Sequence, residues 1–129
     1  MYIFKSVGVF ALVFAITLAG EAMAAGEHAH GAKHGGQFVE VDGHQGVEMV
    51  VSGDTLIFHI TENDKPADLK GASMRAVIQT DAGVRMYPLS VEGSTLKTKL
   101  ADPLPNGAKI AISGKDGHGH TLQARFVKK

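Results

Sequence analysis

Histidine is the residue type in this sequence whose number and spacing could support chemistry. The chain of 129 residues contains seven histidines, and four of them fall between positions 28 and 44: His28, His30, His34 and His44. Imidazole is the commonest metal-binding side chain, and several imidazoles on a flexible backbone can surround a borderline cation. We therefore expect this segment to bind a divalent transition metal, Cu or Zn first and Ni or Co next. The alternative is a hydrophilic linker in which the histidines are incidental.

A second pair of histidines lies near the end of the chain, in His118-Gly119-His120. Two imidazoles separated by one residue fall on one face of an extended strand and can bind one metal ion through two nitrogen atoms. The alternative is a glycine-rich hairpin turn over Lys115–Gly119 that merely tolerates histidine. If the segment with His28, His30 and His34 folds back onto this turn, a composite site of four nitrogens forms.

The remaining polar and sulfur-containing side chains are expected to be structural. His59 alternates with Phe58 and Ile60 and is predicted to lie on the solvent face of a strand. Glu48, Asp64 and Asp68 are expected to be solvated charges. Three methionines share parity with apolar positions and are predicted to be core packing: Met49, Met74 and Met86.

Composition excludes several classes of protein. With no cysteine in the chain, disulfides, zinc-thiolate clusters, iron–sulfur centres, blue-copper sites and thiol enzymes are ruled out. A formal net charge of zero argues against nucleic acid as a partner. The chain has no Gly-x-Ser-x-Gly elbow, no His-Glu-x-x-His helix and no phosphate-binding glycine loop, so we expect no enzyme.

The first residues have the layout of a secretory signal peptide. Lys5 is followed by the apolar stretch Val7–Ala19 and then by small residues up to Ala24. The stretch is shorter than the ~20 residues that a membrane span needs, so cleavage is favoured over a permanent anchor. We predict a signal peptide over residues 1–24 and a periplasmic location for the mature chain.

The cleavage position affects the predicted metal chemistry. Cleavage after Ala24 fits best, because small residues then occupy both key positions of the peptidase pocket. Cleavage after Ala25 would give a chain beginning Gly26-Glu27-His28, in which the free amine, two backbone nitrogens and the imidazole hold Cu(II) or Ni(II) in a square plane.

The mature chain is predicted to consist of a leader and one β-domain. Residues 25–36 contain four glycines and no large apolar side chain, which predicts a flexible His/Gly-rich leader. Residues 37–129 show short alternating runs separated by turn residues every eight to twelve positions. This pattern predicts an all-β fold, a small antiparallel β-sandwich of about eight strands, immunoglobulin- or cupredoxin-like. Pro88 lacks a backbone donor and should lie at a sheet edge or a bulge.

Three stretches of the domain resemble a known family. They are residues 34–41 (HGGQFVEV), 47–50 (VEMV) and 56–67 (LIFHITENDKPA). Over about residues 34–78 the chain resembles the small periplasmic β-domain near the start of some membrane-fusion subunits of cobalt-zinc-cadmium and copper efflux pumps, and similar stand-alone secreted proteins. It lacks the coiled-coil hairpin and lipoyl-like half-motif of the full subunits, so it is not the adaptor itself.

The resemblance implies a periplasmic companion to metal handling, with a metal-efflux pump component as a partner and with His34 as the ligand carried over by position. Two hypotheses therefore remain. The first is a non-enzymatic periplasmic protein that buffers or delivers a transition metal. The second is a small interaction module or envelope accessory protein whose histidines are incidental.

Overall fold

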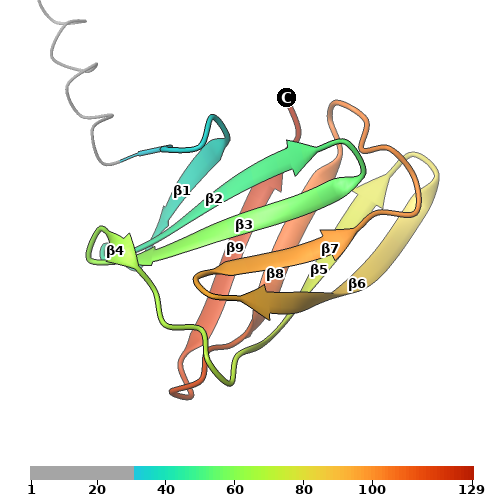
Figure 1. Ribbon diagram of the computed structural model, residues 1–129. Helices are drawn as coiled ribbons and strands as arrows, with labels where there is room; N and C mark the ends of the chain where they lie inside the picture. The colour runs from blue at the N-terminus through green and yellow to red at the C-terminus, as the bar shows by residue number, and fades with distance from the viewer. Residues whose placement is uncertain (1–30) are drawn as a thin grey trace, which may run out of the picture. The chain divides into compact units, whose positions relative to one another are not determined.

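Alternating apolar and polar residues form nine β-strands within residues 31–129, the part of the chain that the computed structural model describes (Figure 1). The strands are β1 (Gln37–Val41), β2 (Gln45–Ser52), β3 (Thr55–Glu62), β4 (Lys65–Pro66), β5 (Ser73–Thr80), β6 (Gly83–Glu92), β7 (Thr95–Lys99), β8 (Lys109–Lys115) and β9 (Thr121–Val127). All paired strands are antiparallel, and the described residues contain no α-helix. The predicted all-β fold is thus confirmed.

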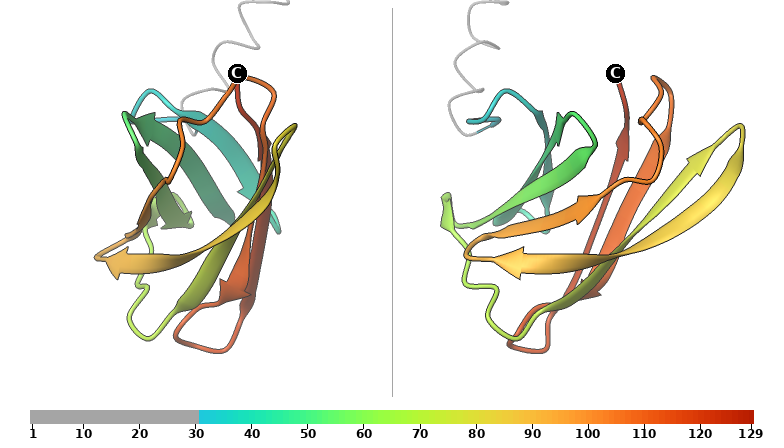
Figure 2. Two further views of the ribbon diagram at one scale, coloured as in Figure 1. Left: turned by 90° about the vertical axis from the view of Figure 1, so that its right-hand side faces the viewer. Right: turned by 45° about the vertical axis from the view of Figure 1, so that its right-hand side comes forward.

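The strands form one continuous sheet rather than the two separate sheets of the predicted sandwich. Its order is β1-β2-β3-β7-β6-β5-β8-β9, with β4 paired to β3. The sheet curls until β9 approaches β1, so that it nearly closes into a barrel (Figure 2). At this seam the Gln37 side chain bridges the two strands: its Nε2 donates to the Val127 carbonyl at 2.9 Å, and its Oε1 accepts from the Lys129 amide at 3.1 Å.

Strand β6 joins the two halves of the sheet. Residues Gly83–Leu89 pair with β5, whereas Ser90–Glu92 pair with β7. The first part of β6 therefore has a neighbour on one side only. Pro88 lies in this part, where its missing N–H can face the free edge, which agrees with the edge position predicted for it.

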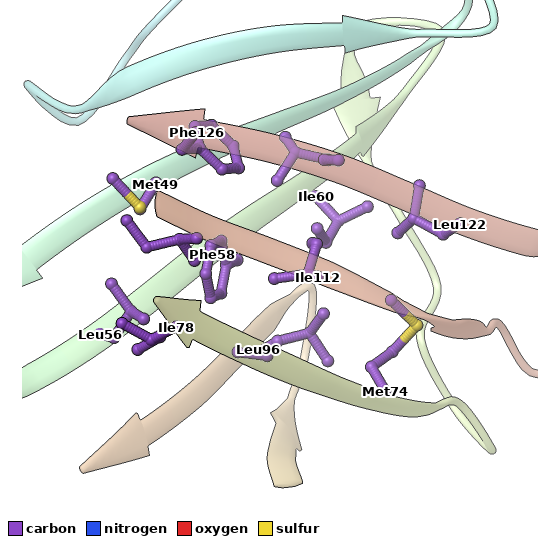
Figure 3. Packing of buried hydrophobic residues seen from close by; sticks show 14 of the residues in the cluster. Met49, Leu56, Phe58, Ile60, Met74, Ile78, Leu96, Ile112, Leu122 and Phe126 are labelled. Atoms are coloured by element: carbon purple, nitrogen blue, oxygen red, sulfur yellow. The ribbon is translucent and has the colours of Figure 1, made fainter. Parts of the chain in front are cut away.

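The inner face of the curled sheet holds an aliphatic core around Phe58 (Figure 3). The Phe58 and Phe126 rings pack with centroids 5.9 Å apart. Met49 and Met74 are buried in this core, as predicted. The prediction for Met86 was wrong, because its side chain is 61% exposed on the outer face of β6. Apolar residues occur on both faces of this strand, so alternation alone could not decide which face is inside.

The first thirty residues lie outside the described residues, and with them the predicted signal peptide over 1–24 and the predicted membrane-anchor alternative. Between residues 31 and 129 there is no helix of sufficient length and hydrophobicity to cross a membrane. The compact unit with the nine strands comprises Ala32–Lys129. It therefore includes the end of the segment 25–36 that the sequence assigns to the leader.

The two methionine environments predict unequal effects of one substitution. Met49→Ala removes a side chain that is 2% exposed and should lower the free energy of unfolding by about 2–5 kcal/mol. Met86→Ala removes one that is largely solvated and should change it by less than about 0.5 kcal/mol. Urea unfolding followed by circular dichroism measures both, and equal losses would contradict the assigned faces.

Candidate functional site

A buried carboxylate organises the outer face of β2. The Glu48 residue is 4% exposed, although its side chain points away from the core. Oε1 accepts the amide of Lys33 at 2.9 Å, and Oε2 accepts the amides of His34 and Gly36, both at 2.8 Å. The Nδ1 atom of His34 lies 3.0 Å from Oε1. Both oxygens are thus satisfied by the segment just before β1.

The Gly35-Gly36 dipeptide allows this segment to reach the carboxylate. Gly35 has a φ of 77°, in the left-handed region that glycine adopts without strain. A Cβ on Gly36 would collide with the Met49 carbonyl, so only glycine fits against β2. A little further on, the Phe38 ring covers Gly46, where a Cβ would lie 2.6 Å from the ring. The chain therefore packs directly on the outside of β2.

The hydrogen bonds keep Glu48 ionised. Burial by itself raises the pKa of this carboxyl, but the amide of Lys33, the His34 side chain and the amides of Gly36 and His34 outweigh that effect. Together they lower the pKa from 4.5 to about 2. The site therefore contains a permanent negative charge near neutral pH, contrary to the expectation that Glu48 is an ordinary solvated acid.

The His34 ring is held in a defined orientation. A carboxylate only accepts hydrogen bonds, so the Nδ1 of His34 that faces Glu48 carries the proton. In the neutral ring the free lone pair is then on Nε2. The side chain as a whole is 49% exposed.

His59 on β3 lies beside this pair. Its ring stacks on that of His34, with centroids 3.6 Å apart and planes 5° from parallel. His59 is also the cross-strand partner of Glu48 in the β2–β3 ladder. His59 lies on the outer face of its strand, as predicted, but it is half-buried there against the His34 ring.

The pKa of His59 is lowered from its ordinary value. Burial is the largest cause, and the positive charge that His34 can carry is the second. Glu48 acts in the opposite direction and Lys97 adds to the lowering. The ring is thus held in its neutral form, which can bind metals, at pH values where a solvated histidine begins to protonate.

The arrangement provides one oriented imidazole and a second one against it. Metal-binding histidines usually donate their other ring N–H to a carboxylate or carbonyl, as His34 does to Glu48. In residues 31–129 no three His, Cys, Asp or Glu side chains converge as a ready metal site. The lone pairs of two parallel rings run side by side, so a shared ion would require the rings to tilt.

His44 lies apart from this site. It is in the β1–β2 turn, where its Nδ1 is 3.0 Å from the Asp42 carbonyl. Four strand positions separate it from Glu48, which corresponds to about 13 Å along β2. The structure therefore does not bring His44 together with His34.

His118 and His120 belong to the β8–β9 turn. The Asp116 Oδ1 accepts the amides of His118 and His120 at 2.9 and 2.8 Å, and the His120 Nδ1 lies 3.3 Å from Oδ2. Gly119 has a φ of 88°. These contacts account for the turn, and the role of the two histidines as metal ligands stays a prediction. The turn lies at the opposite end of the barrel from residues 32–36 (Figure 1).

His28 and His30 lie outside the described residues, so among the predicted ligands only His34 belongs to the cluster observed here. Glu48 and His59 were missed as members of that cluster. The available signal was their register: both point outward on adjacent strands, beside a His-Gly-Gly sequence whose glycines permit close approach.

Comparison with known proteins adds no assignment: no protein-family model, no curated protein and no solved structure matches the chain.

The lowered pKa of Glu48 predicts a stability loss in acid. Its stabilising contribution is complete above the unfolded-state pKa near 4.5 and disappears as the pH falls towards about 2. A difference of this size corresponds to roughly 3 kcal/mol. Urea unfolding across this pH range should show the loss. The dependence of the unfolding free energy on pH should become flatter in Glu48→Gln and should stay as in wild type in Glu40→Gln, an exposed control. An unchanged slope in Glu48→Gln would contradict the assignment, and carboxyl NMR of the wild type gives the pKa directly if that variant does not fold.

The stack predicts coupled histidine titration. In wild type the pKa of His59 should be below the ordinary value of about 6.5. His34→Ala uncovers the His59 ring and removes a neighbouring positive charge, so the pKa should rise, whereas His44→Ala should leave it unchanged. Proton NMR of the ring signals measures both, and the same His59 pKa in all three proteins would exclude the stack.

Proposed function

We propose that this protein is a periplasmic, non-enzymatic protein that binds a divalent transition metal and buffers or delivers it. The observation that supports this function is the His34 ring, which is anchored through Nδ1 to the buried Glu48 while about half of the side chain stays exposed. An imidazole oriented by a carboxylate is a more basic ligand than a freely rotating one. His59 provides a second neutral imidazole at the same place.

The preceding segment can supply the missing ligands. His30 is four residues before His34 and His28 is six before it, so a fully extended chain places them at most about 14 and 21 Å away. Both are therefore within reach of the His34 Nε2 by chain length alone. In this proposal the metal is held by His34, His28 and His30, with His59 as a fourth ligand after a tilt of its ring.

The choice of metal follows from the donor set. Imidazole nitrogens suit Cu, Zn and Ni, and the general order of affinity ranks Cu(II) first. The absence of cysteine leaves no thiolate to favour Zn(II) or Cu(I). We therefore propose Cu(II) or Zn(II) as the ion, with Ni(II) and Co(II) weaker. The proposed partner is a component of a metal-efflux pump, as the family resemblance implies.

The proposed location and architecture complete this function. The signal-peptide pattern of residues 1–24 supports export to the periplasm. The near-closed sheet is compatible with the immunoglobulin- or cupredoxin-like class only at the level of antiparallel β-structure. Affinity should fall on mild acidification, because a protonated imidazole cannot bind a metal ion.

Calorimetric titration of the chain from Ala25 onward with Cu(II), Zn(II) and Ni(II) tests the proposal. His34→Ala and the double change His28→Ala/His30→Ala should each weaken binding at least tenfold, and Glu48→Gln by roughly 10–100-fold through loss of ring orientation. His44→Ala, and His118→Ala with His120→Ala, are matched controls and should have less than a twofold effect.

Two results would contradict the proposal. If wild type binds none of the three ions more tightly than roughly millimolar, ΔG is no better than about −4 kcal/mol and the interaction-module alternative is favoured. If only the change at His118 and His120 abolishes binding, the metal site is in the β8–β9 turn and not at His34.

A further inference from the structure

The outer face of the sheet half β6-β5-β8-β9 carries positive charge without compensating acids. In the observed register its outward positions include four exposed basic residues: Arg75, Lys109, Lys115 and Arg125. None of the four forms an ion pair with another residue of 31–129. This is a marked local excess in a chain whose formal net charge is zero.

Three acids near the ends of these strands form no ion pair with the four basic residues. Asp81 is in the β5–β6 turn beyond the end of the strands. Asp116 is in the β8–β9 turn, where its carboxylate accepts two turn amides. Glu92 is at the far end of β6 and pairs with Lys97 at 3.2 Å. The charges on the face are therefore available to a negatively charged partner.

The same face holds most of the exposed apolar surface. Of the four large apolar side chains that are exposed among the described residues, three lie here: Val84 at 64%, Met86 at 61% and Val127 at 51%. Val77 and Ala111 lie between them in the same rows of the sheet. A shallow groove of about 380 Å³ is lined by Val77, Ala111 and Val127 together with Lys109 and Arg125.

The arrangement of these groups distinguishes between two anionic partners. Protein interfaces gain most of their energy from a few anchors in well-packed pockets. Here the exposed apolar side chains are instead spread from β6 to β9, about 14 Å at normal strand spacing, with the basic side chains among them. Dispersed Lys and Arg around short aliphatic side chains suit a membrane surface, where each charge acts nearly independently.

We propose that this face, formed by β5, β6, β8 and β9, docks the protein on an anionic phospholipid surface. The basic side chains contact lipid phosphates, while Val84, Met86 and Val127 enter the headgroup boundary. This function is additional to metal binding and does not depend on it, because the histidine cluster is on β2, β3 and the segment before β1.

Vesicle sedimentation at about pH 8 in the presence of a chelator tests the proposal, since the chelator keeps the histidines free of metal. The protein is the chain from Ala25 onward, which contains the compact unit Ala32–Lys129 and lacks the apolar stretch Val7–Ala19. It should bind phosphatidylglycerol vesicles and not phosphatidylcholine vesicles. Raising the salt from low concentration to about 0.15 M should weaken binding severalfold.

Charge variants locate the contact. Each basic residue near an anionic surface contributes a factor of about five, so Lys109→Glu with Arg125→Glu should reduce binding at least 25-fold. Lys65→Glu with Lys99→Glu, on β4 and β7, makes the same change in net charge outside the face and should have less than a threefold effect. All four side chains are exposed, and circular dichroism verifies that both variants fold.

Three outcomes would overturn the proposal. Wild type binds both vesicle types equally or neither; the two double variants lose binding equally, which indicates net charge alone; or wild type binds a polyglutamate peptide but not phosphatidylglycerol, which indicates an acidic protein partner instead.

Discussion

The structure around the histidine cluster depends on one ionised carboxylate taken out of water. A buried carboxylate is tolerated only when hydrogen bonds replace its hydration. Glu48 obtains them from backbone amides of Lys33, His34 and Gly36, and these lie on a segment with no regular secondary structure. The charge therefore fixes where the chain enters β1.

Other features follow from that fixed entry. The Phe38 ring lies over Gly46, so β2 is covered on its outer face as well as by the core. The His34 ring is placed parallel to His59 at 3.6 Å instead of rotating in solvent. Two glycines allow the segment before β1 to pack against β2. Gly36 has no side chain to collide with the Met49 carbonyl, and Gly35 adopts a left-handed backbone conformation. The orientation of the His34 ring is thus a consequence of the hydrogen bonds that replace the hydration of Glu48.

Local sequence predicted the strands well and their partners poorly. The alternation of His59 with Phe58 and Ile60, from which a strand was predicted, falls within the Thr55 and Glu62 boundaries of β3. Alternation and turn residues determine these boundaries over short distances. The expected sandwich became a continuous sheet because β6 pairs first with β5 and then with β7, which is a long-range property.

The same distinction explains the site. His34 was predicted because His-Gly-Gly is a local pattern. Glu48 and His59 were not, because burial of Glu48 depends on a segment more than ten residues earlier and the stack depends on strand register. The β8–β9 turn, in contrast, depends on residues close together in the sequence. Asp116 and Gly119 lie within the turn itself, and the hairpin turn that the sequence offered as an alternative is observed there.

The distribution of charge over the sheet is compatible with both proposed binding surfaces. A cation site loses affinity when positive side chains lie within a Debye length, about 8 Å at physiological salt. The four unpaired basic residues are on β5, β8 and β9, whereas the histidine cluster is on β2, β3 and the segment before β1, so the two sets of strands meet only where β9 approaches β1 at the seam. The nearby Lys97 is paired with Glu92, which reduces its effect on His59. Glu48 adds the one buried negative charge beside the imidazoles. A chain of zero net charge can thereby attract metal cations on one half and anionic lipid on the other, since the relevant fields are local.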